Sequence, residues 1–131
     1  MNRVVLDASA VLAVLQQEPG ADRVLASLPD AVVSAVNFAE VVTRMSRRDS
    51  NLSQEMADLH NLFQNILPFD SKQAEVTGLL EPLTKPFGLS LGDRACLALG
   101  KSLGAVVLTT DGDWTKPNHG VQIELIRGRP S

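Results

Sequence analysis

The sequence predicts an α/β fold with a mostly parallel sheet covered by helices on both faces. Short runs of β-branched and aliphatic residues alternate with helical patterns along the whole chain, as in strand–helix–strand units joined by right-handed crossovers. The chain has 131 residues, of which 44% are hydrophobic, and a chain of that size can bury roughly two thirds of its unfolded surface. Because no linker, repeat or low-complexity segment interrupts it, we expect one domain over residues 1–131.

The predicted strands are short apolar runs that end in polar residues or turn signals. They cover residues 4–6, 31–33, 66–69, 105–108 and 121–126. Runs of this length and composition are typical of strands buried on both faces of a sheet. Five such runs predict a sheet of about five strands.

The predicted helices are separated by proline, glycine and capping signals. They cover residues 10–15, 21–28, 36–48, 52–63, a segment that begins at Asp70, and 90–103. Ser53 is the predicted cap of the fourth helix, and Asp70 with Gln73 resembles a capping box. Prolines and a glycine at 82–88 predict a kink or loop, and Gly104 is a candidate C′ residue. The tail 127–131 is expected to be loose.

The helix over 36–48 has two distinct faces. The apolar face carries Phe38, Val41, Val42 and Met45. The polar face carries Asn37, Glu40, Arg44 and Arg47. Spacings of three and four residues place each set on one side of a helix, so this helix is expected to bury one face and present the other.

Composition excludes several classes of protein. The single cysteine, Cys96, cannot form an internal disulfide, and no cysteine–histidine cluster suggests zinc. No apolar run approaches the roughly 18 residues of a membrane span, and an acid at position 7 precedes any signal-peptide core. These features favour a cytoplasmic protein without a membrane partner. The net charge of −3 argues only weakly against nucleic acid, because a bound Mg²⁺ would change the local charge.

Four acids occupy equivalent positions in the predicted fold. Asp7 and Asp111 follow apolar strands, whereas Glu40 and Asp93 lie in the first turns of helices. Strand ends and helix starts share one edge of a parallel sheet, and ligands of such sheets bind there. Converging carboxylates repel one another unless a cation neutralises them, and hard ions such as Mg²⁺ or Mn²⁺ prefer oxygen ligands. The four acids therefore predict a metal site suited to hydrolysis of phosphodiesters.

Each acid also has a purely structural interpretation. Asp93 can cap its helix together with Ser90, and Asp7 can begin a turn. Glu40 can pair with Arg44 one turn later on a solvated helix. Asp111, followed by Gly and Asp, is a natural turn residue. The joint placement of four acids in apolar surroundings favours the metal site over these separate alternatives.

The motifs around these acids resemble those of PIN-domain ribonucleases, and most of all the VapC toxins of bacterial and archaeal toxin–antitoxin pairs. The motifs are Val-Leu-Asp7-Ala-Ser9-Ala, Asn37-Phe-Ala-Glu40-Val, Leu-Ser-Leu-Gly-Asp93-Arg94-Ala and Leu-Thr-Thr-Asp111-Gly-Asp113-Trp114. They occur in the order of the family and cover nearly the whole chain.

The resemblance implies a three-layer α/β/α sandwich and an Mg²⁺- or Mn²⁺-dependent endoribonuclease. By that resemblance Asp7 and Asp93 are direct metal ligands, and Glu40 and Asp111 complete the site. Ser9, Asn37 and Asp113 are supporting residues; Asp113 leaves open which acid of the fourth motif faces the metal. The implied partners are an RNA substrate, a cognate VapB-like antitoxin that covers the active site, and a second copy in a homodimer.

Several arginines, both histidines, Trp114 and Cys96 remain outside these motifs or beside their acids. Arg44, Arg47 and Arg48 form either a solvated face or a contact with the RNA backbone, and Arg94 holds a phosphate or pairs with a carboxylate. Trp114 is expected to pack its loop, with base stacking as the alternative. His60 and His119 are expected at the surface, and Cys96 in the core.

Two other classes of function compete with the nuclease: another acidic α/β protein, either a phosphatase or a phosphoacceptor receiver domain, and a non-catalytic module. A phosphatase with a nucleophilic aspartate needs a second aspartate two residues after the first, and Ser9 occupies that position. A phosphoacceptor receiver domain needs paired acids near the first strand and a lysine after the last, and neither pattern occurs. A non-catalytic RNA-binding or interaction module with the same fold remains an alternative that an activity assay decides.

Overall fold

A computed structural model describes residues 3–48 and 51–127. It contains one five-stranded sheet in the order β3-β2-β1-β4-β5, with every neighbouring pair parallel. The strands are β1 (Val4–Leu6), β2 (Ala31–Ser34), β3 (Ile66–Leu67), β4 (Val106–Thr109) and β5 (Ile123–Leu125). The predicted parallel sheet of about five strands is confirmed. The third strand is shorter than predicted because Pro68 has no N–H for the sheet ladder.

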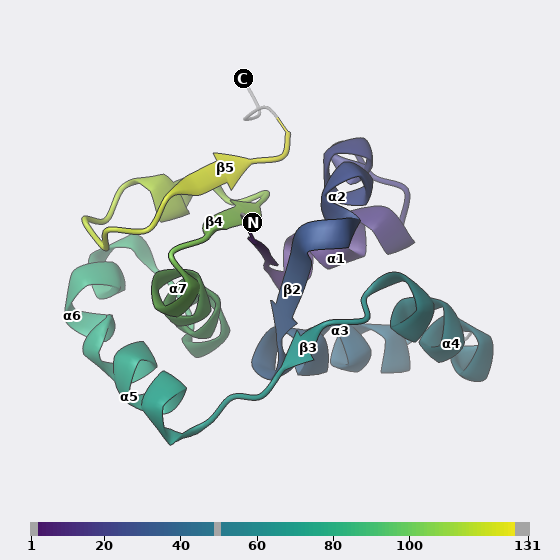
Figure 1. The fold of residues 1–131 in the computed structure, drawn as a ribbon, viewed down its shortest axis with the longest axis horizontal. Coiled ribbons are helices and arrows are strands. Elements are labelled where there is room, and N and C mark those ends of the chain that lie inside the picture. Colours follow the sequence, from purple (N-terminus) through teal and green to yellow (C-terminus); the bar gives the residue numbers. More distant parts are fainter. Residues whose placement is uncertain (1–2, 49–50, 128–131) are drawn as a thin grey trace.

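Helices cover both faces of this sheet (Figure 1). One layer contains α1 (Ala8–Leu15), α2 (Ala21–Ser27), α3 (Ala35–Ser46) and α4 (Leu52–Leu62), with the short η1 (Leu28–Asp30) after α2. The other contains α5 (Ser71–Leu79), α6 (Glu81–Thr84), η2 (Lys85–Phe87) and α7 (Leu91–Leu103). The predicted three-layer α/β/α sandwich is confirmed.

The central strand shows how the two layers are kept apart. Val4 and Leu6 of β1 belong to the core beneath α1–α4, whereas Val5 belongs to the core beneath α5–α7. Successive strand residues point to opposite faces, so a strand with no polar residue is buried on both sides. This burial fits the central position of β1 in the strand order. The residue after β1 therefore lies at the middle of the edge that the carboxyl ends of the strands form.

The predicted cap of α5 is confirmed, because Asp70 accepts a hydrogen bond from the backbone N–H of Gln73. Asp7, whose structural interpretation was only the start of a turn, caps α1 by accepting a hydrogen bond from the backbone N–H of Ala10. The predicted cap of α4 is wrong, because Asn51, two residues before Ser53, accepts a hydrogen bond from Gln54 N. Asparagine is at least as good an N-cap as serine, and with Asn51 as the cap the helix begins at residue 52, as predicted.

The structure also bears on the predicted interruption at 82–88 and on the expected loose tail. The predicted interruption at 82–88 consists of α6 and η2, which begin at or near prolines and end at Gly88 in the left-handed conformation. Arg127 of the expected loose tail lies 3.9 Å from Glu18 in an ion pair, whereas residues 128–131 lie outside the described residues. Within residues 3–48 and 51–127, no helix is long and apolar enough to cross a membrane.

Candidate active site

Asp7 lies directly after the central strand and is almost completely buried, with 5% of its surface exposed. Its Oδ1 accepts hydrogen bonds from Ser9 Oγ at 2.7 Å and from the backbone N–H of Ala10 at 2.8 Å. Its Oδ2 accepts one from Thr109 Oγ1 at 2.6 Å. Burial raises the pKa of Asp7 to about 6, although these hydrogen bonds oppose the shift and the charge of Asp93 adds to it.

Ser9 and Thr109 connect the first acid to the end of β4. Ser9 Oγ accepts a hydrogen bond from Thr110 N at 3.1 Å, and Thr109 Oγ1 accepts one from Asp111 N, also at 3.1 Å. The structure thus places Ser9, a predicted supporting residue, against the Asp7 carboxylate, and it adds Thr109, which was not among the predicted site residues. The parallel register of Leu6 with Leu108 places residue 109 beside residue 7; only knowledge of that register could have identified it.

Glu40 lies in the second turn of α3, beside the start of α7. Asn37 Nδ2 donates to Glu40 Oε1 at 2.7 Å and to the backbone carbonyl of Gly92 at 3.0 Å. Asn37 is fully buried although it lies on the predicted polar face, and its Oδ1 has no hydrogen-bond partner in the described structure. Partial burial raises the pKa of Glu40, the Asn37 hydrogen bond opposes the shift, and the Asp93 charge adds to it.

Asp93 has the capping role that its structural interpretation predicted. Ser90 N donates to Asp93 Oδ2 at 2.9 Å, and Asp93 N donates to Ser90 Oγ at 3.2 Å, which forms a complete capping box for α7. Burial raises the pKa of Asp93; the Ser90 bonds oppose the shift, the Asp111 charge adds to it, and the Arg94 charge lowers it. Because Asp93 also lines the cavity described below, capping and a place in the site are compatible.

The two acids of the fourth motif point to different partners. Asp111 caps the short η3 (Gly112–Thr115) through the backbone N–H of Asp113, and its side chain lines the cavity. The Asp113 carboxylate is exposed and accepts a hydrogen bond from Lys116 Nζ at 2.7 Å. The geometry therefore favours Asp111 as the acid that belongs to the site.

One cavity of about 640 Å³ brings the four acids together from four separate segments. Its lining includes Asp7, Glu40, Asp93 and Asp111. Asp93 interacts electrostatically with each of the other three, which places it at the centre of the acidic group. Among the described residues, no three acid, histidine or cysteine side chains are already arranged to hold a metal ion.

Comparison with known proteins identifies the fold. The model of the PIN domain matches residues 4–119. The chain belongs to the PIN-domain family. The predicted family is confirmed, and the four motifs that suggested it lie within the matched segment. No curated protein matches the sequence.

Solved structures with this PIN fold include toxin–antitoxin complexes. DNA-bound VapBC from Salmonella typhimurium matches with a TM-score of 0.78 and 16% identity, over 97% of this chain and 100% of that chain. FitAcB from Neisseria gonorrhoeae matches with a TM-score of 0.69 and 23% identity, over 92% and 95%. VapBC-5 from Mycobacterium tuberculosis matches with a TM-score of 0.68 and 22% identity, over 98% and 100%. These neighbours agree with the VapC-type resemblance of the motifs.

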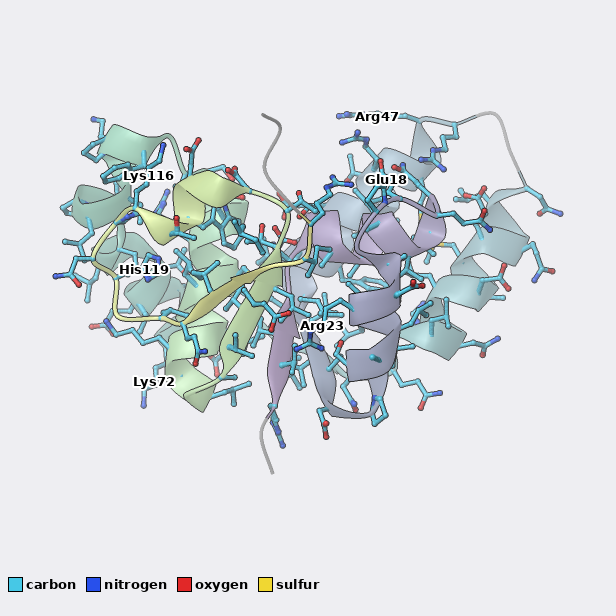
Figure 2. All side chains as sticks on the ribbon, turned by 90° about the horizontal axis from the view of Figure 1, so that it is seen from above. Glu18, Arg23, Arg47, Lys72, Lys116 and His119 are labelled. Atoms are coloured by element: carbon cyan, nitrogen blue, oxygen red, sulfur yellow. The ribbon has the colours of Figure 1, made fainter. Side chains whose placement is uncertain are left out.

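The arginines predicted as possible RNA contacts lie in two different environments. Arg44 and Arg47 line the cavity, and Figure 2 shows Arg47 and Lys116 at the end of the molecule opposite the start of β1. Arg94, in contrast, donates from Nη1 to the carbonyl of Thr77 in α5 at 2.9 Å. Arg94 therefore ties α5 to α7. Its charge lowers the pKa of Asp93, but among the described residues no carboxylate forms an ion pair with it.

The expected surface position of His119 is wrong. Its ring is buried, with Nε2 at 2.7 Å from the carbonyl of Trp114, while Nδ1 accepts a hydrogen bond from Val121 N at 3.0 Å. This arrangement requires the tautomer with the proton on Nε2, and it holds the loop between η3 and β5. His60 is exposed as expected.

Trp114 and Cys96 pack as predicted, both in the core beneath α5–α7. Trp114 also lines one wall of the cavity, although its indole is only 1% exposed. Burial raises the pKa of the Cys96 thiol well above its ordinary range, so this cysteine is an inert core residue.

Proposed function

We propose that this PIN domain is an Mg²⁺- or Mn²⁺-dependent endoribonuclease that cleaves RNA phosphodiesters. The observation that carries the proposal is the common cavity of Asp7, Glu40, Asp93 and Asp111 at the carboxyl edge of the sheet. Membership of the PIN-domain family supports nuclease activity, and the toxin–antitoxin complexes among the structural neighbours support a toxin role.

The donors in the cavity fit a hard divalent cation. All four acids offer carboxylate oxygens, which Mg²⁺ and Mn²⁺ prefer over nitrogen or sulfur ligands. The pKa values of Asp7, Glu40 and Asp93 are all raised, and in each case the charge of a neighbouring acid adds to burial. A cation favours the ionised form of such carboxylates, so its binding would offset the free-energy cost of ionising acids that are buried and close to one another.

The proposed roles of the four acids rest on the resemblance of their motifs to those of PIN-domain ribonucleases. Asp7 and Asp93 are the proposed direct ligands, and Glu40 and Asp111 complete the set. Bound Mg²⁺ or Mn²⁺ would supply an activated water and would stabilise the charge that develops on the phosphoryl group.

The supporting residues act on the carboxylates and the substrate. Ser9 and Thr109 orient the Asp7 carboxylate by donating to its two oxygens. Arg44 and Arg47, on the wall of the cavity, are the proposed contacts to the RNA backbone.

Cleavage of RNA by purified protein tests this function. Wild type should cleave with Mg²⁺ or Mn²⁺ and should be inactive in EDTA, and Asp93→Asn should be folded and inactive. Asp58→Asn, which changes an exposed aspartate on α4, is the matched control and should retain full activity. Cleavage that continues in EDTA would contradict the metal-dependent mechanism. RNA binding without cleavage under any condition would favour the non-catalytic module instead.

We propose further that the chain is the toxin of a type II toxin–antitoxin pair and acts in the cytoplasm, bound in its inactive state to a VapB-like antitoxin. Expression of the chain alone should arrest growth, and co-expression with the protein encoded next to it should restore growth. Arrest by the Asp93→Asn variant would show that the toxicity is unrelated to the proposed chemistry.

We also propose that the chain forms a homodimer through the groove between α5, α6 and α7. Leu79 and Leu83 line this groove and are 70% and 45% exposed. Lys72 lines it as well, and Glu75 on the same helix is exposed, so a two-fold axis can pair opposite charges around an apolar centre. Light scattering should show a dimer for wild type and a monomer for Leu79→Lys. A monomeric wild type would refute the proposal.

A further inference from the structure

A glycine in the first turn of α7 leaves the space that the Glu40 carboxylate occupies. A Cβ atom built on Gly92 would lie 2.6 Å from both Cδ and Oε1 of Glu40, and closer still to Oε2. Real Cβ atoms do not approach other heavy atoms so closely. The side chain of Glu40 can therefore hold its position only because residue 92 has no side chain.

The backbone of α7 gives no other reason for this glycine. Gly92 is not among the glycines with positive φ, which in the described structure are Gly20, Gly88, Gly104 and Gly120. Alanine favours a helix more than glycine does, so local helix propensity alone would favour alanine at this position. The space required by Glu40 opposes that preference.

Asn37 fixes the carboxylate against the same glycine. Its Nδ2 donates to Glu40 Oε1 at 2.7 Å and to the carbonyl of Gly92 at 3.0 Å. Because the Asn37 side chain is 1% exposed, packing restricts its rotation. Steric space on one side and an amide donor on the other thus define one position for the Glu40 carboxylate, next to Asp93.

We propose that Gly92 is a positioning residue, whose missing side chain sets the location of the Glu40 carboxylate in the acidic cavity, with Asn37 as the donor that locks it there. The contact itself is independent of the metal. Its consequence for metal affinity rests on the proposed function, and the two are tested separately.

The first test measures the contact by thermal melting of metal-free protein. Gly92→Ala should displace the flexible end of the Glu40 side chain and cost it the Asn37 hydrogen bond. The change in melting temperature that it causes in wild type should therefore lie at least about 3 °C below the change that it causes in a Glu40→Ala background, where the obstruction is gone. Gly78→Ala is the matched control, since Gly78 lies inside α5 and an added Cβ would meet nothing within 4 Å. It should raise the melting temperature in both backgrounds.

The second test measures Mn²⁺ affinity by titration calorimetry. Gly92→Ala should weaken Mn²⁺ binding by about 10- to 100-fold, as changes to groups that orient a ligand typically do. Gly92→Ala/Glu40→Asp should recover part of that affinity, because aspartate is one methylene shorter. Gly100→Ala is the control for a purely structural effect: its Cβ would meet Val107 Cγ2 at 2.6 Å in the core, so it should lower stability and leave Mn²⁺ affinity unchanged.

The outcomes separate this inference from the proposed function. An equal melting shift for Gly92→Ala in both backgrounds would refute the positioning role, and so would unchanged Mn²⁺ affinity in a folded variant. If Gly92→Ala does not fold, Gly92→Ala/Glu40→Ala should fold, and failure of both would assign the glycine to packing alone. A wild type that binds no Mn²⁺ would refute the metal nuclease, while the melting experiment would still decide whether Gly92 positions Glu40.

Discussion

Replacing Asp7 with asparagine should make the metal-free protein more stable at neutral pH while abolishing cleavage. Burial raises the pKa of this carboxyl from its ordinary value of 3.8 to about 6 in the folded protein. The folded state therefore binds the proton more tightly than the unfolded state. The contribution of the Asp7 proton to the free energy of unfolding is fully present below about pH 4. It is lost as the pH rises through about 6, and the free energy of unfolding stays at the lower level above that pH.

The size of the effect follows from the pKa difference and the hydrogen bonds. The rise in pKa corresponds to roughly 3 kcal/mol of lost stability at neutral pH, and asparagine avoids that loss because it does not ionise. Its Oδ1 can keep the bonds from Ser9 and Ala10, but its Nδ2 cannot accept the bond from Thr109. Losing that bond costs about 1 kcal/mol. The net gain is about 2 kcal/mol, or roughly 6–10 °C in melting temperature.

Urea denaturation in EDTA between pH 4 and 8 measures this difference. The free energy of unfolding of wild type should fall between pH 4 and 6, a trend to which the raised pKa values of Glu40 and Asp93 also contribute. Asp7→Asn should show a shallower fall, and the exposed control Asp58→Asn should follow wild type. Added Mn²⁺ should stabilise wild type and not the variant. An Asp7→Asn protein that is less stable than wild type at pH 7.5 would refute the reasoning.

Three further predictions concern the acids, the buried histidine and the arginines. Asp111→Asn should abolish RNA cleavage, whereas Asp113→Asn should reduce it by less than about threefold; the reverse result would exchange their roles. His119→Ala leaves the buried carbonyl of Trp114 and the partly buried N–H of Val121 without their partner, so it should lower the unfolding free energy by about 2–4 kcal/mol in urea. Arg47→Gln should make the slope of log affinity against log salt concentration for RNA shallower by the equivalent of about one phosphate contact. Arg94→Gln should lower the stability of the protein and leave that slope unchanged.

The fold could be predicted because its signals are local. Strands buried on both faces appear as short apolar runs, and prolines, glycines and capping residues mark where helices begin and end. The errors arose where two local signals compete. Asn51 and Ser53 are both good caps two residues apart, and Pro68 ends a strand that the apolar residues around it would continue.

The acids of the site could be predicted for the same reason, because strand ends and helix starts are visible in the sequence. Their supporting contacts could not. Thr109 donates a hydrogen bond to Asp7 from 102 positions away in the sequence. The carboxylate of Glu40, from another helix, lies in the space that a side chain at Gly92 would occupy. His119 is buried because its ring satisfies two backbone groups of its own loop. Such contacts depend on strand register and helix packing, which hydrophobic periodicity does not specify.

Three of the four acids are also N-caps or capping-box residues: Asp7 for α1, Asp93 for α7 and Asp111 for η3. Asparagine caps a helix about as well as aspartate, so a single-nucleotide change can remove a carboxylate and leave the helix intact. If the chain has the proposed nuclease activity, one nucleotide change therefore separates it from an inactive protein that still folds. Cells that escape the proposed toxicity should then accumulate folded variants without a carboxylate before they accumulate unfolded ones.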